Sequence, residues 1–550
     1  MYLFLPEALE FAFSAVSSSI NPKRAPPKTY AEAMRRPDAH LWHEAACKEI
    51  DALVERGTWV PAKLPPGKKA IGSRWVFVVK YKADGSLERY KARLVIKGFS
   101  QLPVIDYGEI YASTLRWEVL RAILAMAAIE DLYVGCADAD NAFVNGDLDR
   151  EIHMEQPEGF PQGSPDMVLR LKKPLYGLKQ GPFLWHEKLD EILTSLGFTK
   201  LQSDASVWFY EKDGVRIIVP VYVDDMTVVS KSKSDVENFF DQLEKHIKIR
   251  RLGEITSILG VKVDRDRAKC TIHLSQKQYI INMLERYGFA DCGTVSTPID
   301  PGVALTEEQC PKTDEEKQEM RSIPYISAIG SLIYLAISTR PDISFAVGRL
   351  ARYNTNPGPA HWQAVKHLFR YLKGTMDYRL TLSPDSTTSE LFVGYSDADH
   401  GGCKDTGYST GGYVMKMGNG AISWRSKLQD VVTNSTTEAE YIAAYSGGTE
   451  VLFLRKLFTE LGYSFPDPTT LYLDNQSAIK VTQKPEHHGR MKHLDLKWFW
   501  LRDEVTKWKT LQTVHCPGDF MPADILTKAL PASKVKTACK LLGLSGPGLD

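Results

Sequence analysis

Apolar positions along the chain follow two spacings, one typical of helices and one typical of strands. Between residues 29 and 59, apolar side chains such as Leu41, Ala45 and Ile50 recur at roughly helical spacing, which predicts a helix. The segment 73–101 then holds two stretches rich in aromatic and β-branched residues around Asp84-Gly85, a pair typical of a tight β-hairpin. The folded part therefore begins with a helix followed by a hairpin.

The same two patterns alternate through the rest of the chain. Helical spacing returns over 116–132 and 234–247, and the β-branched segment 216–230 predicts two strands that meet at Asp224-Asp225. A Pro-rich, charged connector at 297–322 marks a boundary, after which helices lead to a strand-rich segment and a helix over 437–462. This order predicts a mixed α/β (α+β) fold class.

Composition limits the class of protein. The 550 residues correspond to three to four units of about 150 residues, and 43% hydrophobic with 25% charged residues is typical of folded globular chains. The eight cysteines contain no CxxC pair, which argues against a zinc ribbon and a secreted disulfide framework. With no secretion signal and no apolar run of about 18 residues, we expect an intracellular, cytoplasmic protein outside the membrane.

Charge gives no direct sign of a partner, because 68 basic and 68 acidic residues cancel. Locally the balance differs. Residues 74–97 carry seven basic and two acidic side chains, a net charge of +5, and residues 484–509 carry a net charge of +3. Within the second strip, His493 and Trp498 are candidates to face a nucleic acid, although core packing is the more common role of such a Trp. Both strips suit a polyanionic ligand.

Carboxylates at strand ends indicate the chemistry. Asp224 and Asp225 would stand at the tip of the predicted hairpin, and Asp138 ends another apolar stretch. In-line displacement at phosphorus is commonly supported by two magnesium ions, which need hard oxygen ligands converging from separate elements. The alternative for an isolated Asp-Asp pair is a solvated turn.

Three motifs in order resemble the reverse transcriptase of copia-type LTR retrotransposons. They are DADNAFVNGDL from Asp138, PLYGLKQGPFLW from Pro174 and YVDD from Tyr222 to Asp225. The resemblance implies that Asp138, Asp224 and Asp225 are catalytic metal ligands and that Tyr222 lies at the substrate.

The resemblance also assigns substrate contacts. It places Phe143 against the ribose 2′-hydroxyl, where it selects deoxynucleotides, with core packing as the alternative. It places Gln180 and Gly181 along the nucleotide and template pocket. Of the basic residues in the hairpin, Arg93 and Lys97 are preferred as triphosphate and template contacts.

A second set of acids lies in the C-terminal part. It consists of Asp397, Glu440, Asp474 and Asp524. Their order resembles RNase H, which implies catalytic and metal-binding roles for all four in cleaving the RNA strand of an RNA-DNA hybrid. Glu438 is the alternative to Glu440, because it lies one helical step away.

Together these resemblances imply a right-hand polymerase of fingers, palm and thumb, a helical connection and an RNase H-like domain. The expected segments are a leader (1–28), reverse transcriptase (29–300), linker and connection (301–389), RNase H (390–530) and a tail (531–550).

The expected cofactor is Mg²⁺, two ions per site, with Mn²⁺ as a substitute. The expected partners are an RNA template, a DNA primer, RNA-DNA hybrid, deoxynucleoside triphosphates and an element-encoded integrase or capsid protein, with a virus-like particle as the location for an intact element. The alternative function is a decayed remnant that at most binds nucleic acid.

Overall fold

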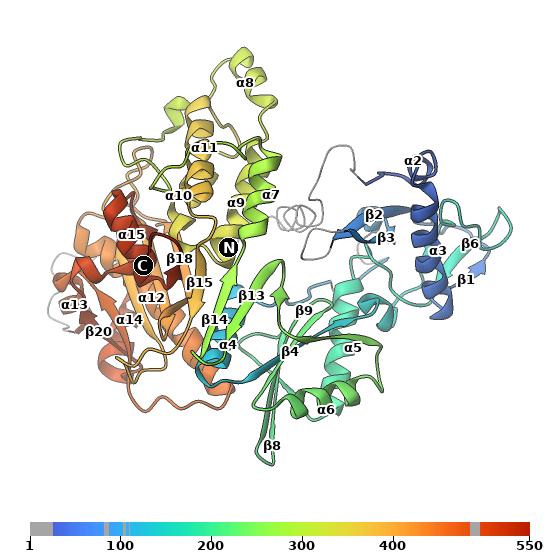
Figure 1. The fold of residues 1–550 in the computed structure, drawn as a ribbon, viewed down its shortest axis with the longest axis horizontal. Helices are drawn as coiled ribbons and strands as arrows, with labels where there is room; N and C mark the ends of the chain where they lie inside the picture. Colours follow the sequence, from blue (N-terminus) through green and yellow to red (C-terminus); the bar gives the residue numbers. More distant parts are fainter. Residues whose placement is uncertain (1–25, 82–86, 103–105, 109, 484–495, 550) are drawn as a thin grey trace. The chain divides into compact units, whose positions relative to one another are not determined.

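The structure is a computed structural model, which describes residues 26–81, 87–102, 106–108, 110–483 and 496–549 (Figure 1). Its chain separates into two compact units. The described residues of the first unit lie within 26–115 and 133–254, and those of the second lie within 116–132 and 255–549. The predicted polymerase segment 29–300 thus contributes to both units, and the predicted domain borders stay predictions.

The N-terminal part of the first unit is a helix packed on a two-stranded hairpin. Its elements are α2 (Tyr30–Met34), α3 (Ala39–Glu55), β2 (Ser73–Tyr81), β3 (Leu87–Ile96) and the small sheet of β1 (Trp59–Ala62), β6 (Val168–Leu171) and β5 (His153–Met154). Trp42 of α3 is 1% exposed and packs edge-on against Phe77 and Tyr90 of the hairpin. The predicted helix and hairpin are confirmed, with the Asp84-Gly85 turn outside the described residues.

The second part of the first unit is a six-stranded antiparallel sheet in the order β11-β4-β10-β9-β8-β7. Its strands are β4 (Tyr133–Ala139), β7 (Thr199–Lys200), β8 (Val207–Lys212), β9 (Val215–Tyr222), β10 (Asp225–Ser230) and β11 (Ile249–Glu254). The helices α5 (Gly181–Ser195) and α6 (Lys233–Leu243) share a buried core with it, through residues such as Leu189 and Phe240. The predicted strand pair and the helix over 234–247 are confirmed.

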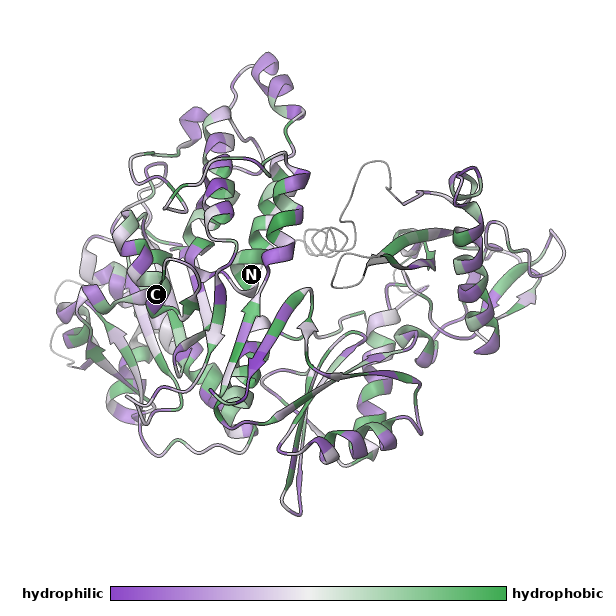
Figure 2. Cartoon of the chain, viewed as in Figure 1, coloured by the Kyte–Doolittle hydropathy of each residue, from purple (hydrophilic) through white to green (hydrophobic). Residues whose placement is uncertain are grey.

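The second unit contains a five-stranded sheet in the order β12-β13-β14-β15-β21 together with a group of helices. Its strands are β12 (Ser257–Ile258), β13 (Val261–Asp266), β14 (Thr271–Ser275), β15 (Arg379–Leu382) and β21 (Leu544–Ser545). Its helices are α7 (Lys277–Arg286), α8 (Asp314–Arg321), α9 (Tyr325–Ser338), α10 (Ser344–Ala351), α11 (Pro359–Gly374) and α15 (Ala532–Leu541). Figure 2 shows that α8 is mostly hydrophilic and that α9 is mostly hydrophobic. Across the described residues no single helix has the length and apolarity of a membrane span, and the α8–α9 pair, bent by 54°, passes that test only jointly.

A mixed sheet in the order β18-β17-β16-β19-β20 forms the rest of the second unit. Its strands are β16 (Val393–Ala398), β17 (Thr410–Met417), β18 (Gly420–Leu428), β19 (Thr469–Leu473) and β20 (Leu511–His515), and its helices are α12 (Thr436–Glu460), α13 (Gln476–Gln483) and α14 (Leu496–Asp503). The first three strands are antiparallel, whereas β16, β19 and β20 run parallel to one another. Parallel strands bring their carboxyl ends to one edge, where β16 delivers Asp397 and β19 is followed by Asp474.

Helix α4 (Trp117–Ile129) belongs to the second unit, although β4 of the first unit follows it directly in the chain. Its buried Arg121 donates hydrogen bonds to the backbone carbonyls of Ile422, Ile337 and Ser338 and lies 3.7 Å above the Trp424 ring. Burial lowers the pKa of this guanidinium to about 9. Arg121 therefore fixes α4 to the sheet and to the end of α9.

Candidate active sites

The predicted polymerase aspartates lie on neighbouring strands of the six-stranded sheet. Asp225, the first residue of β10, stands opposite Asp138 of β4 on one side and opposite Tyr222 of β9 on the other. Directly opposed residues of antiparallel strands project from the same face, so Asp138, Tyr222 and Asp225 share a face of the sheet. Asp224 lies in the tight turn between β9 and β10.

That turn has an unusual backbone. Val223 adopts a φ of +57°, a left-handed conformation that a β-branched residue rarely takes. Two hydrogen bonds hold it: the indole Nε1 of Trp185 donates to the Val223 carbonyl at 2.8 Å, and the backbone N–H of Ala139 donates to the Asp224 carbonyl at 2.9 Å. Helix α5 and strand β4 thus fix the position of the aspartate pair.

Two arginines approach these acids. Arg250 of β11 places Nη2 2.7 Å from Asp138 Oδ2, and Arg93 of β3 places Nη2 3.8 Å from Asp224 Oδ2. Burial raises the pKa of Asp224, the charge of Asp138 raises it further, and Arg93 opposes the shift. The carboxylate oxygens of Asp138, Asp224 and Asp225 do not converge on one point. Among the described residues, only Asp397, Glu440 and Asp474 offer a group of carboxylate oxygens that all lie within 4.8 Å of one another.

The basic face of the hairpin is built by alternation along β3. Ala92, Leu94 and Ile96 are buried, which leaves Arg93 on the opposite face beside the exposed Lys97 at the strand's end. Arg93 also lies 4.8 Å above the ring of Tyr176. Of the predicted pair, Arg93 is therefore directed toward Asp224, while the role of Lys97 stays a prediction.

Backbone contact joins the hairpin to the segment that precedes α5. The N–H of Ile96 donates to the Tyr176 carbonyl at 2.8 Å, and a Cβ added at Gly98 would lie 1.9 Å from the Gly177 carbonyl. Gly177 has a φ of +93° and equally little room. Both positions therefore require glycine.

Phe143 packs against this same segment. Its half-buried ring meets Tyr176 edge-on, with 4.7 Å between centroids. An added Cβ at Gly181 would meet the Leu175 carbonyl oxygen at 3.5 Å and Phe143 at 3.8 Å, both ordinary contacts, so this position has room for alanine. Their predicted contacts with the nucleotide stay predictions.

Gln180 is fully buried, and its amide is already bonded. Its Nε2 donates to the Asp106 carbonyl at 2.9 Å, and its Oε1 accepts from Gln101 Nε2 at 3.0 Å. In this structure Gln180 therefore joins the start of α5 to the segment that follows β3, and a direct contact of its amide with a nucleotide stays a prediction.

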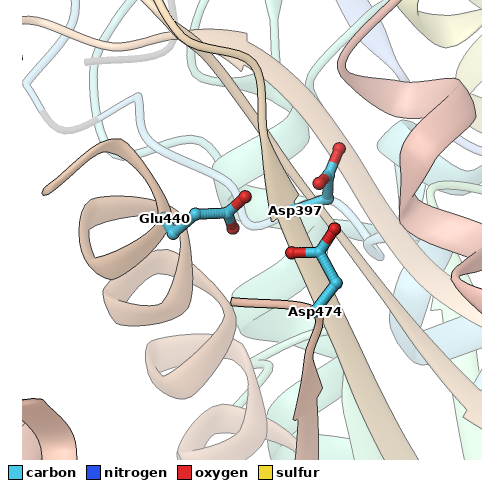
Figure 3. A group of neighbouring side chains, drawn as sticks. All are labelled: Asp397, Glu440 and Asp474. Atoms are coloured by element: carbon cyan, nitrogen blue, oxygen red, sulfur yellow. The ribbon is translucent and has the colours of Figure 1, made fainter. Parts of the chain in front are cut away.

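The predicted nuclease acids converge closely. Asp397, Glu440 and Asp474 each offer a carboxylate oxygen within 4.8 Å of the others, and Figure 3 shows Glu440 reaching from its helix toward the two aspartates. Glu438 instead accepts from the backbone N–H of Asn434 at 2.8 Å and serves the start of α12. The structure thus brings Glu440 into the group and directs Glu438 to the helix cap.

The nuclease acids are buried together, which shifts their protonation. Burial raises the pKa of Glu440 to about 10, aided by the charges of Asp397 and Asp474, and burial with Asp397 also raises the pKa of Asp474. Glu440 is 5% exposed, and its Oε2 has no hydrogen-bond partner among the residues that the structure describes. Hard carboxylate oxygens, one of them orphaned, fit a magnesium ion.

Asp524 lies beside this group and is joined to it through a lysine. Lys528 Nζ is 3.0 Å from Asp524 Oδ1 and 3.4 Å from Asp397 Oδ2, and Thr527 Oγ1 also donates to Asp397 Oδ2. Burial raises the pKa of Asp524 to about 6, with a further contribution from Asp397. All four predicted acids thus belong to one neighbourhood, in which Asp524 is reached across Lys528.

Sequence reasoning missed four of the residues around the two sites. They are Trp185, Arg250, Thr527 and Lys528. Lys528 alone had a local signal, since it follows Asp524 by four residues, the spacing of neighbours on a helix. His493 and the side chain of Trp498, proposed from the basic strip, lie outside the described residues.

Comparison with known proteins shows which protein family the chain resembles. Residues 56–301 match the family described as reverse transcriptase (RNA-dependent DNA polymerase). The chain is 40% identical over 520 residues to the Retrovirus-related Pol polyprotein from transposon TNT 1-94 of Nicotiana tabacum, which covers 94% of this chain and 39% of that protein. The corresponding protein from transposon RE2 of Arabidopsis thaliana is 35% identical over 521 residues, 94% of this chain and 35% of that protein.

A shorter relative is matched almost completely. The putative transposon Ty5-1 protein YCL074W of Saccharomyces cerevisiae is 32% identical over 309 residues, which cover 56% of this chain and 97% of that protein. The chain therefore belongs to the reverse-transcriptase family of copia-type retrotransposon Pol polyproteins, and the resemblance found in its motifs is confirmed. It spans about two fifths of the tobacco protein and about one third of the Arabidopsis protein.

One solved structure aligns with most of the chain. It is the foamy viral protease-reverse transcriptase in complex with double-stranded DNA, with a TM-score of 0.43 and 12% identity over 92% of this chain and 81% of that chain. That TM-score is too low for the fold to be inferred from it.

Proposed function

We propose that the chain is an RNA-directed and DNA-directed DNA polymerase that also cleaves RNA in RNA-DNA hybrids. The observation that carries the polymerase half is the register of β4, β9 and β10, in which Asp138 and Asp225 stand opposite each other next to Asp224. The convergence of Asp397, Glu440 and Asp474 supports the nuclease half. The proposed partners are an RNA template, a DNA primer, the hybrid and deoxynucleoside triphosphates.

The proposed cofactor is Mg²⁺, with Mn²⁺ as a substitute. Asp138, Asp224 and Asp225 would hold it for polymerisation, and Asp397, Glu440, Asp474 and Asp524 for hydrolysis. When bound, the ion supplies charge neutralisation at the reacting phosphate and a more acidic water. The chain's own residues supply the rest: Arg93 offers a planar donor for phosphate oxygens, and Phe143 with Tyr176 forms a wall beside the predicted sugar position.

Primer extension tests the polymerase half. Purified protein is incubated with an RNA template, a DNA primer, deoxynucleotides and Mg²⁺, and wild type is compared with Asp224→Asn. We expect extension only by wild type. The matched control is Asp213→Asn, at an exposed aspartate in the neighbouring β8–β9 turn, which should extend normally. Equal extension by Asp224→Asn would refute the assignment.

Hybrid cleavage tests the nuclease half separately. A labelled RNA-DNA hybrid should be cut by wild type and not by Asp474→Asn. Asp467→Asn, at an exposed aspartate before β19, is the control and should cut normally. Cutting by Asp474→Asn at the wild-type rate would refute the nuclease assignment.

The second candidate function is that of a decayed remnant, which at most binds nucleic acid. It predicts retention of a labelled hybrid with no extension that depends on Asp224. We further propose an intracellular location, which the eight free cysteines support. In an intact element the location would be a virus-like particle, with an element-encoded integrase or capsid protein as a partner.

A further inference from the structure

The ammonium group of Lys528 lies between two of the four predicted nuclease acids, Asp397 and Asp524. Its Nζ lies 3.4 Å from Asp397 Oδ2 and 3.0 Å from Asp524 Oδ1, and thus between the converged group and the fourth acid. The Lys528 side chain is 40% exposed, whereas that of Asp397 is only 1% exposed. A flexible cation therefore reaches from the site's edge to a buried carboxylate.

The surroundings of Asp397 Oδ2 hold this arrangement. Thr527, which is fully buried, donates its hydroxyl to the same oxygen, and its Oγ1 also lies 3.1 Å from the Asp524 carbonyl oxygen. Asp397 Oδ2 thus already faces a hydroxyl donor and an ammonium. Asp524 Oδ1 lies within ion-pair distance of Lys528 but has no hydrogen bond with any part of the chain that the structure describes, so the pair is electrostatic.

Charge and space limit what else can bind there. Magnesium binds carboxylate oxygens at about 2.0–2.1 Å, so an ion bridging Asp397 Oδ2 and Asp524 Oδ1 would overlap the volume of the ammonium. Ions of like charge a few ångströms apart repel strongly in a partly buried site. Lys528 must therefore leave before a divalent ion can bridge these two acids.

We propose that Lys528 is a positioning residue that substitutes for one of the two cations of a four-acid nuclease site. The proposal rests on the RNase H activity proposed above. In this chain the site then takes one divalent ion, among Asp397, Glu440 and Asp474. The ammonium of Lys528 holds Asp524 to Asp397 in place of a second ion, so that Asp524 is removed from the set of four metal ligands proposed above. Four carboxylates are balanced by one divalent ion and one lysine together with the solvent.

The test counts bound ions and does not depend on activity. Mn²⁺ is titrated into the full chain, and free Mn²⁺ is measured by electron paramagnetic resonance. All proteins carry Asp224→Asn and Asp225→Asn, so that the polymerase acids do not contribute. We expect one bound ion when Lys528 is present, and its loss when Asp474→Asn is added.

Replacing the lysine should open the second position. Lys528→Met should bind two ions, while Lys528→Arg and Lys456→Met, a control at an exposed lysine of α12, should still bind one. Asp524→Asn should also leave the count at one, which tests the proposal even if Lys528→Met does not fold. Two ions with Lys528 in place, none at all, or one ion in folded Lys528→Met would overturn it.

Cleavage of an RNA-DNA hybrid distinguishes a failure of the one-ion inference from a failure of the proposed RNase H activity. Cleavage that depends on Asp474 in a protein that binds two ions would sink the one-ion inference and leave the nuclease assignment standing. Absence of any cleavage that depends on Asp474 would refute the nuclease assignment itself.

Discussion

Arg250 Nη2 lies 2.7 Å from Asp138 Oδ2, across the paired strands β11 and β4. The neighbouring Arg251 points to the other side of β11, where Glu237, Asp241 and Glu244 hold it at 2.6–2.9 Å. Alternation along a strand explains the split, because successive side chains face opposite sides of the sheet. Arg251 thus fixes the strand from which Arg250 reaches a predicted metal ligand.

Removal of Arg250 should tighten metal binding at the polymerase acids. Arg250→Met takes away a positive charge beside Asp138, and a partly exposed pair of this kind is worth about 0.2–1 kcal/mol. Mn²⁺ affinity should therefore rise by a factor of roughly 1.5–5. Isothermal titration calorimetry with Mn²⁺, in proteins that also carry Asp474→Asn, measures this affinity. Arg250→Lys is the control that preserves the positive charge. An unchanged or weaker affinity in Arg250→Met would contradict the prediction.

Metal binding at the nuclease acids should release a proton. Since the pKa of Glu440 is raised to about 10, its carboxyl is protonated at pH 8 in the metal-free chain and must ionise to become a ligand. Mg²⁺ titrations in buffers of different ionisation enthalpy should show release of about one proton, and Glu440→Gln should show none. Equal release by both proteins would assign the proton to another group.

The same shift sets a pH dependence of stability. A carboxyl whose folded pKa lies above its unfolded value of 4.5 binds its proton more tightly when folded, so stability falls as pH rises from about 4.5 toward 10. Asp524, raised to about 6 from 3.8, contributes a similar loss at lower pH. In EDTA, Glu440→Gln should have a shallower decline of Tm between pH 6 and 9 than wild type. A steeper decline would count against the shift.

The Val223 turn should be relaxed by asparagine. Val223→Asn places a residue that tolerates a positive φ where valine does not, so the free energy of unfolding should rise by about 1 kcal/mol. Thermal denaturation measures the change. Val215→Asn, at the first residue of strand β9, which precedes the turn, is the control and should not stabilise the chain. Destabilisation by Val223→Asn would mean that the valine side chain contributes more than its backbone costs.

Trp185 should matter more for polymerisation than an equally buried tryptophan. Trp185→Phe removes the hydrogen bond to the Val223 carbonyl, and Trp208→Phe removes a bond of the same 2.8 Å length to Asp190, away from the turn. Both variants should lose about 1–3 kcal/mol of stability. Only Trp185→Phe should slow primer extension, by roughly tenfold. Equal slowing by both variants would point to a general loss of packing.

Local patterns predicted the elements that depend on nearest neighbours. Helical spacing gave α3, α4 and α6, and β-branched runs gave the hairpin strands around Asp224, because each pattern reports which face is buried. Glu438 follows Ser435 by three residues, a spacing typical of a helix cap, and the structure uses it so. The choice of Glu440 over Glu438 could therefore have been made on local grounds.

Contacts between distant residues could not be read from such patterns. Lys528 meets Asp397 across 131 positions, and Arg250 meets Asp138 across 112, because sheet order and packing bring them together. Gln180 was predicted from its motif alone, which identifies a residue but not the direction of its amide. Tertiary structure decides all three.

Helix α4 ends at Ile129, and the strand that carries Asp138 begins four residues later. Ten residues of α4 are buried, and Arg121 is hydrogen-bonded to carbonyls more than 200 positions further along the chain. A fragment cut at the C-terminal border of the matched family, residue 301, would keep this helix and lose those partners. The polymerase portion should therefore be expressed together with the C-terminal region, because without that region the buried face of α4 would be exposed to solvent.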